Sequence, residues 1–493
     1  MNILLVYPEF PETFWSFRHA LSFIGKKAVM PPLGLLTVAA MLPEEWTPRL
    51  VDMNVQRLTR RDLEWADYVF ISAMVAQRAS VVEVLERCAE AGVPTVAGGP
   101  LFLGEHEDFP QVDHFVLNEA EVAFPEFVRD LQAGQARRVY EMDGHPDLSL
   151  TPAPRWDLVD MRRYAQMCIQ FSRGCPFNCD FCNITAMLGR TPRTKTAPQL
   201  LAELDALYEA GWKGDVFIVD DNFIGNKRIL KSQVLPALIE WRKSRPEVGF
   251  QTEVSINLAD DPELIELMVA AGFTTVFVGI ETPDEDSLAE CSKIQNRGRD
   301  LKESVRYLQR AGLDVQGGFI VGFDSDKPGI FEQQVKFIQE TGIITAMVGL
   351  LQAIKGTELY ERLQREGRLL AESTGNNTDA SINFIPKMDL QVLLEGYKRI
   401  LENIYSPEAY YERVRIFLQH YMPAGVVKPK LRLPEFKAFF RSIYRLGIRG
   451  GERIYYWKLF FWTLFRRPSL FPKAITYSIY GFHFRRVWET YTR

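Results

Sequence analysis

Three cysteines crowd into one short segment, Cys175-Pro176-Phe177-Asn178-Cys179-Asp180-Phe181-Cys182, with the spacing C-x3-C-x2-C. Cysteine thiolates are the usual ligands of iron–sulfur clusters. A compact loop with three thiols can hold three irons of a cubane and leave the fourth iron free for a small ligand. The spacing therefore predicts an iron–sulfur cluster on Cys175, Cys179 and Cys182, with one open iron.

A zinc knuckle or chance spacing would be the alternatives. Structural zinc takes four ligands, often as two pairs. Cys88, Cys168 and Cys291 are remote in sequence and fall on predicted core elements, and no nearby Cys/His pair supplies a fourth ligand. The segment resembles the radical S-adenosylmethionine (SAM) superfamily, in which an aromatic residue, here Phe181, precedes the last cysteine. The resemblance implies a 4Fe–4S cluster whose open iron binds SAM, and one-electron cleavage of SAM to a 5′-deoxyadenosyl radical.

Length and composition indicate an ordinary globular protein. The chain has 493 residues, 47% of them hydrophobic and 25% charged, which is enough for two or three domains with packed cores. Six cysteines, three of them clustered, do not make a disulfide framework, and the amino terminus has no basic region or cleavage site. We therefore expect a cytoplasmic protein.

The net charge of −5 is distributed unevenly. Residues 428–493 carry fifteen Lys or Arg and three acids, so this basic, aromatic tail is +12 and the rest of the chain is −17. Spanning helices need about 18 or more apolar residues in a row, and no such run occurs. The tail predicts peripheral contact with the inner face of the cell membrane. The alternative is a helical subdomain that packs on the barrel, and no nucleic acid partner is expected.

Short apolar strands alternate with helices in the first third of the chain, which predicts a doubly wound parallel sheet. The predicted strands are residues 2–7, 49–52, 68–72 and 94–97. Such sheets bind ligands at the carboxyl ends of their strands. The loops at those ends are residues 8–12, 52–54, 72–78 and 98–100.

The order of these segments resembles the cobalamin-binding domain of B12-dependent radical SAM proteins. Pro-Pro-Leu-Gly-Leu at residues 31–35 begins the match, and Asn118-Glu119-Ala120-Glu121 ends it, with Asn118 where the family usually has glycine. The resemblance implies cobalamin contacts from Pro32, Leu33, Asp52, Ser72, Met74, Gln77, Gly98, Gly99, Pro100 and Glu119.

Many cobalamin proteins supply a cobalt ligand through Asp-x-His-x-x-Gly, which this chain lacks, since Asp113 and His114 are adjacent. The resemblance therefore implies cobalamin without a protein histidine on cobalt, and with Met74 and Gln77 near its lower face. Two alternatives stay open. The loop after residue 72 could only cap a helix, and the whole domain could be a Rossmann-like fold that has lost its cofactor.

The central third repeats strand and helix with polar groups at the strand ends, as on the active face of a βα barrel. The resemblance implies SAM contacts from Phe181, Asp220, Asp221, Asn222, Glu253, Ser255, Glu281 and Gln316. Capping of the next helix is the structural alternative for a strand-end acid. We expect α/β architecture in four parts: a Rossmann-like cobalamin-binding domain (1–140), a linker (141–165), a partial radical SAM barrel (166–370) and a mostly helical carboxyl-terminal domain (371–493).

Residues 383–413 resemble the carboxyl-terminal domain of one branch of these proteins, to which hopanoid C-2 methylases belong. The resemblance implies methyl transfer from cobalamin to an unactivated carbon of a hydrophobic, lipid- or terpenoid-like substrate such as a hopanoid. A one-electron donor such as flavodoxin or ferredoxin is expected, and no residue is nominated as a general acid or base. The rivals are a non-methylating radical enzyme that cyclises or rearranges its substrate, and a non-catalytic cobalamin or cluster sensor.

Overall fold

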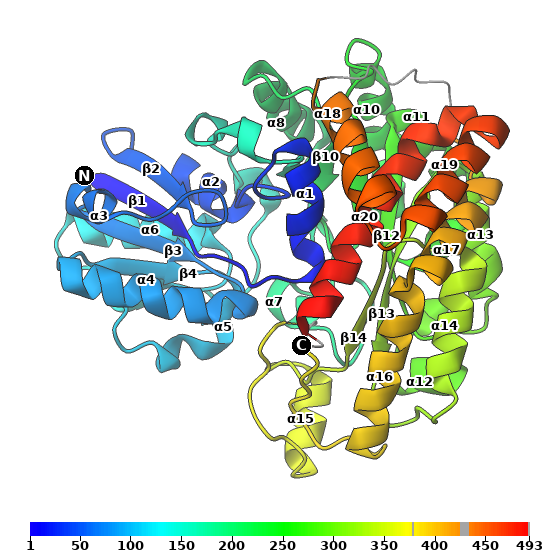
Figure 1. Cartoon of the computed structure of the whole chain (residues 1–493). Helices are drawn as coiled ribbons and strands as arrows, with labels where there is room; N and C mark the ends of the chain where they lie inside the picture. Colours follow the sequence, from blue (N-terminus) through cyan, green and yellow to red (C-terminus); the bar gives the residue numbers. More distant parts are fainter. Residues whose placement is uncertain (377–378, 424–432, 492–493) are drawn as a thin grey trace.

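The computed structural model describes residues 1–376, 379–423 and 433–491. Two parallel sheets and a group of carboxyl-terminal helices make up the molecule (Figure 1). The first sheet lies to one side in blue and cyan, and the second is enclosed by green, yellow and red helices.

The first sheet confirms the predicted Rossmann-like domain. Its six parallel strands have the order β2-β1-β3-β4-β5-β6. The strands are β1 (Asn2–Tyr7), β2 (Thr47–Asp52), β3 (Tyr68–Ser72), β4 (Thr95–Gly98), β5 (His114–Val116) and β6 (Val139–Tyr140). The helices are α1 (Arg18–Ile24), α2 (Leu33–Ala40), α3 (Arg60–Trp65), α4 (Arg78–Ala91), α5 (Pro100–Glu105) and α6 (Ala120–Gln132).

The second sheet confirms the partial barrel. Its six parallel strands have the order β14-β13-β12-β11-β10-β7. They are β7 (Met167–Ile169), β10 (Val216–Ile218), β11 (Phe250–Val254), β12 (Phe273–Glu281), β13 (Asp314–Val321) and β14 (Ala346–Leu350). Its helices are α7 (Ile184–Leu188), α8 (Ala197–Glu209), α9 (Lys227–Ile229), α10 (Leu235–Arg242), α11 (Pro262–Ala271), α12 (Glu285–Glu290), α13 (Leu301–Arg310), α14 (Ile330–Thr341) and α15 (Glu358–Arg365). A two-stranded ribbon, β8 (Ser172–Arg173) and β9 (Arg193–Thr194), flanks the cysteine segment.

Alternation along β11 shows which side chains face the barrel lumen. Gln251 and Glu253 are partly exposed, whereas the residues between and beside them are buried. Because successive strand residues point to opposite faces, both side chains belong to the lumen face. Glu253 pairs with Phe277 of β12, and Phe277 pairs with Gln316 of β13, so these three residues share one level of the barrel.

The carboxyl-terminal helices confirm the predicted helical domain. They are α16 (Leu390–Tyr405), α17 (Pro407–His420), α18 (Leu433–Ser442), α19 (Arg453–Arg466) and α20 (Phe471–Tyr491). The Tyr477 hydroxyl donates to Asp314, the first residue of β13, so α20 covers the amino-terminal end of the barrel strands. Residues 428–432 and 492–493 of the basic tail lie outside the described residues. No helix in the described part of the chain is both long and apolar enough to span a bilayer.

Helix α1 does not cover the first sheet. It packs beside α18 and α20, as Figure 1 shows. The Arg441 guanidinium of α18 donates to the Phe23 carbonyl of α1 at 2.8 Å, and the Tyr491 hydroxyl donates to the Glu12 carbonyl at 2.7 Å. The two ends of the chain therefore build one layer together.

Candidate active site

The backbone before the first cysteine requires glycine. Gly174 has φ +92°, and a Cβ at this position would lie about 3 Å from the carbonyl oxygens of Gly189, Leu188 and Thr191. The Cys175 amide donates to the Gly189 carbonyl at 3.2 Å. The cysteine segment is therefore held closely against the turn that follows α7.

The second half of the segment is fixed by two other elements. The Asp180 amide donates to the Cys291 carbonyl at 3.2 Å, and the Leu359 amide donates to the Asp180 carbonyl at 2.9 Å. The Phe181 ring packs 6.2 Å from the Phe323 ring in a small apolar core. The contact of Phe181 with SAM stays a prediction.

The three predicted cluster ligands lie together. Their thiols are near enough to interact electrostatically, and burial raises the pKa of each, that of Cys182 to about 12. Asn222 Nδ2 lies 3.9 Å from Cys175 Sγ, and Gln295 Nε2 lies 3.7 Å from Cys179 Sγ. Among the described residues, no three His, Cys, Asp or Glu side chains are placed so that they could hold one metal ion together. Three thiols within one short segment are a donor set that fits a cluster with three protein-bound irons.

A buried ion pair stands beside the thiols. Lys293 Nζ lies 2.6 Å from Glu281 Oε1 at the end of β12. Burial lowers the pKa of Lys293, but Glu281 and the thiols outweigh burial and raise it above its usual value. A permanently charged lysine favours thiolates over thiols. Sequence reasoning found Glu281 but missed Lys293 and Gln295, which lie in the loop after α12 and had no motif to mark them.

The acids at the end of β10 divide into two roles. Both oxygens of Asp220 accept hydrogen bonds from Phe171 and Ser172, so this carboxylate positions the backbone that leads to the cysteine segment. Asp221 Oδ2 is buried without a partner among the described residues. Burial raises the pKa of Asp221 to about 6, and burial together with Asp221, Asp220 and Glu281 raises that of Glu253 to about 8. Arg173 near Asp221 and Lys293 near Glu253 lower these pKa values without offsetting burial, so the ammonium of SAM would supply further positive charge that these carboxyls can accept.

Asn222 connects this acidic group to the cysteine segment. Its Oδ1 accepts hydrogen bonds from Ser255 N at 3.2 Å and Ser255 Oγ at 3.3 Å, while Nδ2 points at Cys175. Ser255 lies one residue beyond the end of β11, just before a 3₁₀ helix at residues 256–260. Gln316, at the same level of the barrel as Glu253, lines a cavity that opens toward the barrel floor, and its contact with SAM stays a prediction.

Several predicted cobalamin ligands have structural partners in the first domain. Asp52 accepts hydrogen bonds from Tyr164 OH at 2.9 Å and from Asn54, while the Gln77 side chain bridges Met74 N and Pro8 O. Pro32 and Leu33 begin α2, and Pro100 begins α5. A Cβ on Gly98 would meet Val116 O, and one on Gly99, at φ +94°, would meet Ser72 Oγ. Cobalamin contact for all of these residues stays a prediction.

The carboxyl end of the first sheet nevertheless leaves the apolar side chain of Met74 exposed. Met74 is 46% exposed although its neighbour Ala73 is buried. A Cβ on Gly375 would contact Val75, so the segment after α15 approaches the same loop. The strand ends of the first sheet thus lie beside loops that follow β14. An uncovered methionine at this junction fits a flat macrocycle such as cobalamin.

Glu119 joins the two domains. It pairs with Arg173 at 2.7 Å and with Arg193 at 2.7 Å, and Glu121 pairs with Arg173 at 2.8 Å. Arg173 stands two residues before Cys175. The segment that resembles a cobalamin motif therefore also fixes the backbone of the cysteine segment.

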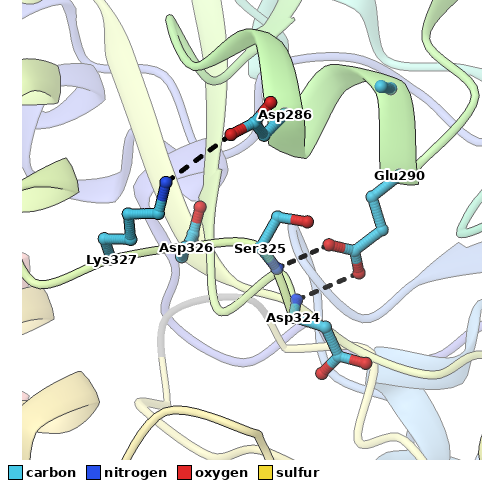
Figure 2. A pocket seen from close by; sticks show the side chains of 7 residues that line it. Asp286, Glu290, Asp324, Ser325, Asp326 and Lys327 are labelled. Carbon is cyan, nitrogen blue, oxygen red and sulfur yellow. Dashed lines mark hydrogen bonds and ion pairs between the residues drawn. The ribbon is translucent and has the colours of Figure 1, made fainter.

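Two hollows lie outside this site. Figure 2 shows the first, an acidic hollow where the Glu290 carboxylate accepts hydrogen bonds from the amides of Asp324 and Ser325. Asp324 is also paired with Arg362 and Arg368. The carboxylates of Glu290 and Asp324 therefore stabilise the turn and are not assigned to a ligand site. The second is a largely apolar cavity of about 720 Å³ between the barrel floor and helices α1, α18 and α20.

Fold and site together define a radical SAM enzyme with a cobalamin-binding domain, and the comparisons agree. Residues 26–128 match the B12 binding domain, 169–338 the radical SAM superfamily and 357–493 a domain of unknown function (DUF4070). An uncharacterized methyltransferase of Synechocystis sp. is 42% identical over 99% of this chain and 92% of its own length. Hopanoid C-2 methylase of Rhodopseudomonas palustris is 35% identical over 93% and 88%. The chain therefore belongs to the B12-binding radical SAM methyltransferases that carry this carboxyl-terminal domain.

Solved structures support the same fold. The cobalamin-dependent SAM radical enzyme OxsB with aqua-cobalamin bound has a TM-score of 0.64 at 15% identity, covering 100% of this chain and 80% of OxsB. The radical SAM methyltransferase TsrM from Kitasatospora setae has a TM-score of 0.58 at 15% identity, covering 76% and 77%.

Family membership makes a 4Fe–4S cluster, SAM and cobalamin the cofactors of this chain, and it makes the chain a B12-dependent methyltransferase. Both rival functions, a non-methylating radical enzyme and a non-catalytic sensor, are therefore disfavoured.

Proposed function

We propose that the enzyme methylates an unactivated carbon of a hydrophobic, lipid- or terpenoid-like substrate, with a hopanoid as the leading candidate. The observation that carries this proposal is the apolar cavity of about 720 Å³ at the barrel floor, which is large enough for such a molecule. The relative from Rhodopseudomonas palustris, a hopanoid C-2 methylase by name, supports the choice of a hopanoid.

The chain's own residues have distinct roles in this reaction. When bound, the cluster and cobalamin supply one-electron cleavage of SAM and a carried methyl group. The three cysteines hold the cluster, and Asn222 and Gln295 donate hydrogen bonds toward two of the sulfurs. Asp221 and Glu253 accept the SAM ammonium. Hydrogen removal by a radical needs no protein acid or base, and a donor such as flavodoxin or ferredoxin supplies the electron.

A surface of α18 and of the π-helix that continues it (Ile443–Ile448) supports peripheral contact with the inner face of the cell membrane. Four exposed apolar side chains, the apolar stripe, follow one another at four-residue steps: Phe436, Phe440, Tyr444 and Ile448. Each is followed by a basic residue: Lys437, Arg441, Arg445 and Arg449. Phe461, Leu464 and Phe465 of α19 are exposed as well. Apolar side chains flanked by cations suit the interface of an anionic bilayer.

Flotation with phosphatidylglycerol vesicles tests the membrane proposal. We expect the chain to float with these vesicles and not with phosphatidylcholine vesicles, and Phe440→Glu to weaken flotation. Ile385→Glu, at an exposed apolar position outside the apolar stripe, is the control and should float normally. Equal flotation of Phe440→Glu and the unsubstituted chain would argue against the apolar stripe.

Isotope transfer tests the reaction. The anaerobically reconstituted enzyme is incubated with trideuteromethyl-SAM, reductant and a bacterial lipid extract, and the lipids are analysed by mass spectrometry. The proposal predicts a terpenoid lipid that gains one trideuteromethyl group. Label that appears only in polar metabolites would contradict the proposed substrate class.

A further inference from the structure

The large cavity reaches into the barrel from its floor. It is lined by Phe217 of β10, Gln251 of β11 and Gln316 of β13, and on the other side by helices α1, α18 and α20. Trp15 also lines it and packs edge-on against Phe277 at 5.1 Å. Because Phe277 pairs with Glu253, the cavity wall extends to the level of the carboxyl group at the cofactor site.

Most of the cavity lining is apolar, but its inner end carries carboxamides. Gln166, Gln251 and Gln316 come from the beginnings of three strands, and their side chains make no hydrogen bond to the described part of the protein. Burial raises the pKa of Tyr480, another lining residue, to about 12, so its hydroxyl is neutral. Glu435, a charged lining residue, lies in the exposed first turn of α18. The apolar wall and the uncharged polar groups at the inner end suit a neutral ligand with an isolated hydroxyl or carbonyl.

We infer that this cavity holds the non-reacting end of an elongated, neutral, apolar substrate, whose isolated polar group binds the carboxamides while its reacting end points up the lumen toward the cysteine segment. The identification of the ligand as substrate rests on the proposed function. From Gln251 to Val254, the last residue of β11, the strand rises about 10 Å, at roughly 3.3 Å per residue. The substrate is therefore at least this long, as a fused-ring terpenoid is.

The position of the cavity also gives the route of entry. Phe436 and Phe439 of α18 belong to its wall, and Phe436 is also part of the apolar stripe. One helix thus separates the cavity from the surface proposed to meet the membrane. We therefore place the entry of a lipid at α18, next to the apolar stripe.

Energy transfer to a fluorescent sterol tests the cavity in the full-length chain without its cofactors. The probe is dehydroergosterol, which has fused rings and one hydroxyl, and Trp15 serves as donor within the cavity. We expect saturable binding that Ala438→Trp weakens at least tenfold by filling the space. Gln251→Leu should weaken binding about fivefold, the effect of one neutral hydrogen bond. Ala91→Trp, the same change on the exposed end of α4, should bind normally.

The possible outcomes test the cavity assignment and the proposed reaction separately. No saturable binding, or equal binding by Ala438→Trp, Gln251→Leu and the unsubstituted chain, overturns the cavity assignment even if labelled lipid is formed. Binding with the expected losses, but no methyl transfer to any lipid by the loaded enzyme, leaves the cavity assignment standing and overturns the proposed reaction.

Discussion

Glu281 has φ 62°, a left-handed conformation that is uncommon for a residue other than glycine. The strand register shifts at this point, which turns the carboxylate toward Lys293. Strained backbone of this kind is concentrated at functional sites. Gly279 completes the arrangement, since a Cβ there would lie 2.2 Å from Glu281 Oε1 and 2.8 Å from Lys293 Nζ.

Gly279→Ala should therefore damage the site without unfolding the barrel. The added methyl displaces the ion pair from the thiols, and we expect SAM cleavage to fall about 100-fold, as for an ångström-scale misplacement in an active site. The measurement is 5′-deoxyadenosine formation by anaerobically reconstituted protein, with circular dichroism to verify folding.

Gly104→Ala is the matched control, because a Cβ at Gly104 meets only Lys355 Cδ, at an ordinary 3.8 Å. Normal cleavage by Gly279→Ala would show that the ion pair is not needed at this position.

Individual residues differ in how far the sequence alone reveals them. Asn118, a departure from the family's glycine, has φ 62°, and asparagine is among the residues that best tolerate this conformation, so the departure is conservative. The three cysteines were predictable because all of them fall within one motif that spans eight positions. Lys293 was not, because only the fold of β12 and the following loop brings it to the thiols.

At the level of elements, α6 supports the cysteine segment through Glu121. Burial raises the pKa of this carboxyl, but Arg173 and Thr151 outweigh burial and lower it, so the ion pair with Arg173 is buried and charged. Arg173 keeps Glu119 as a second partner, so the loss of Glu121 costs about 2 kcal/mol, the value of a hydrogen bond to a charged group, and less than a fully unpaired buried charge would. Glu121→Gln should lower the free energy of unfolding by this order and reduce the iron retained after reconstitution.

Glu126→Gln, on the exposed side of the same helix, is the control, since exposed pairs contribute at most about 1 kcal/mol. If urea denaturation and iron analysis gave the same values for the two variants, the buried pair would have no special role.

Helix α20 holds the amino-terminal segment through a neutral histidine. His483 Nε2 lies 2.9 Å from the Phe14 carbonyl, and burial lowers the pKa of His483 to about 4, with His19 adding to the effect. In the unfolded chain the imidazole titrates near its ordinary value of about 6.5. The unfolded state therefore binds more protons between pH 6.5 and pH 4, and acidification through this window destabilises the fold.

His483→Gln should remove this dependence. From the two pKa values, the histidine accounts for about 2 kcal/mol of stability lost between pH 7 and pH 5. Denaturant unfolding at both pH values should show a smaller loss in His483→Gln than in the unsubstituted chain, while His114→Gln, a partly exposed histidine of the first sheet, should show the full loss. A full loss in His483→Gln as well would mean that the pKa of the imidazole is the same in the folded and the unfolded protein.

Across the whole molecule, the sequence predicted the order of the two α/β units and the helical end, because each has its own hydrophobic periodicity and motif. It did not predict that α1 leaves the first sheet and packs beside α18 and α20, because that contact joins residues more than 400 positions apart. The apolar cavity depends on this layer, since α1 and the two late helices form its outer wall. Periodicity shows that a face is apolar but not which distant segment covers it.

The cysteine segment and the carboxyl ends of the strands in the first sheet, where cobalamin is predicted to bind, are parts of one radical methyltransferase. The yield of the SAM products tests this directly. With a substrate present, each turnover uses one SAM as methyl donor and one as radical source, so S-adenosylhomocysteine and 5′-deoxyadenosine should form in equal amounts with the methylated product. Cys179→Ala should form no 5′-deoxyadenosine. Continued 5′-deoxyadenosine formation by Cys179→Ala, or methylated product without any 5′-deoxyadenosine, would contradict the assignment.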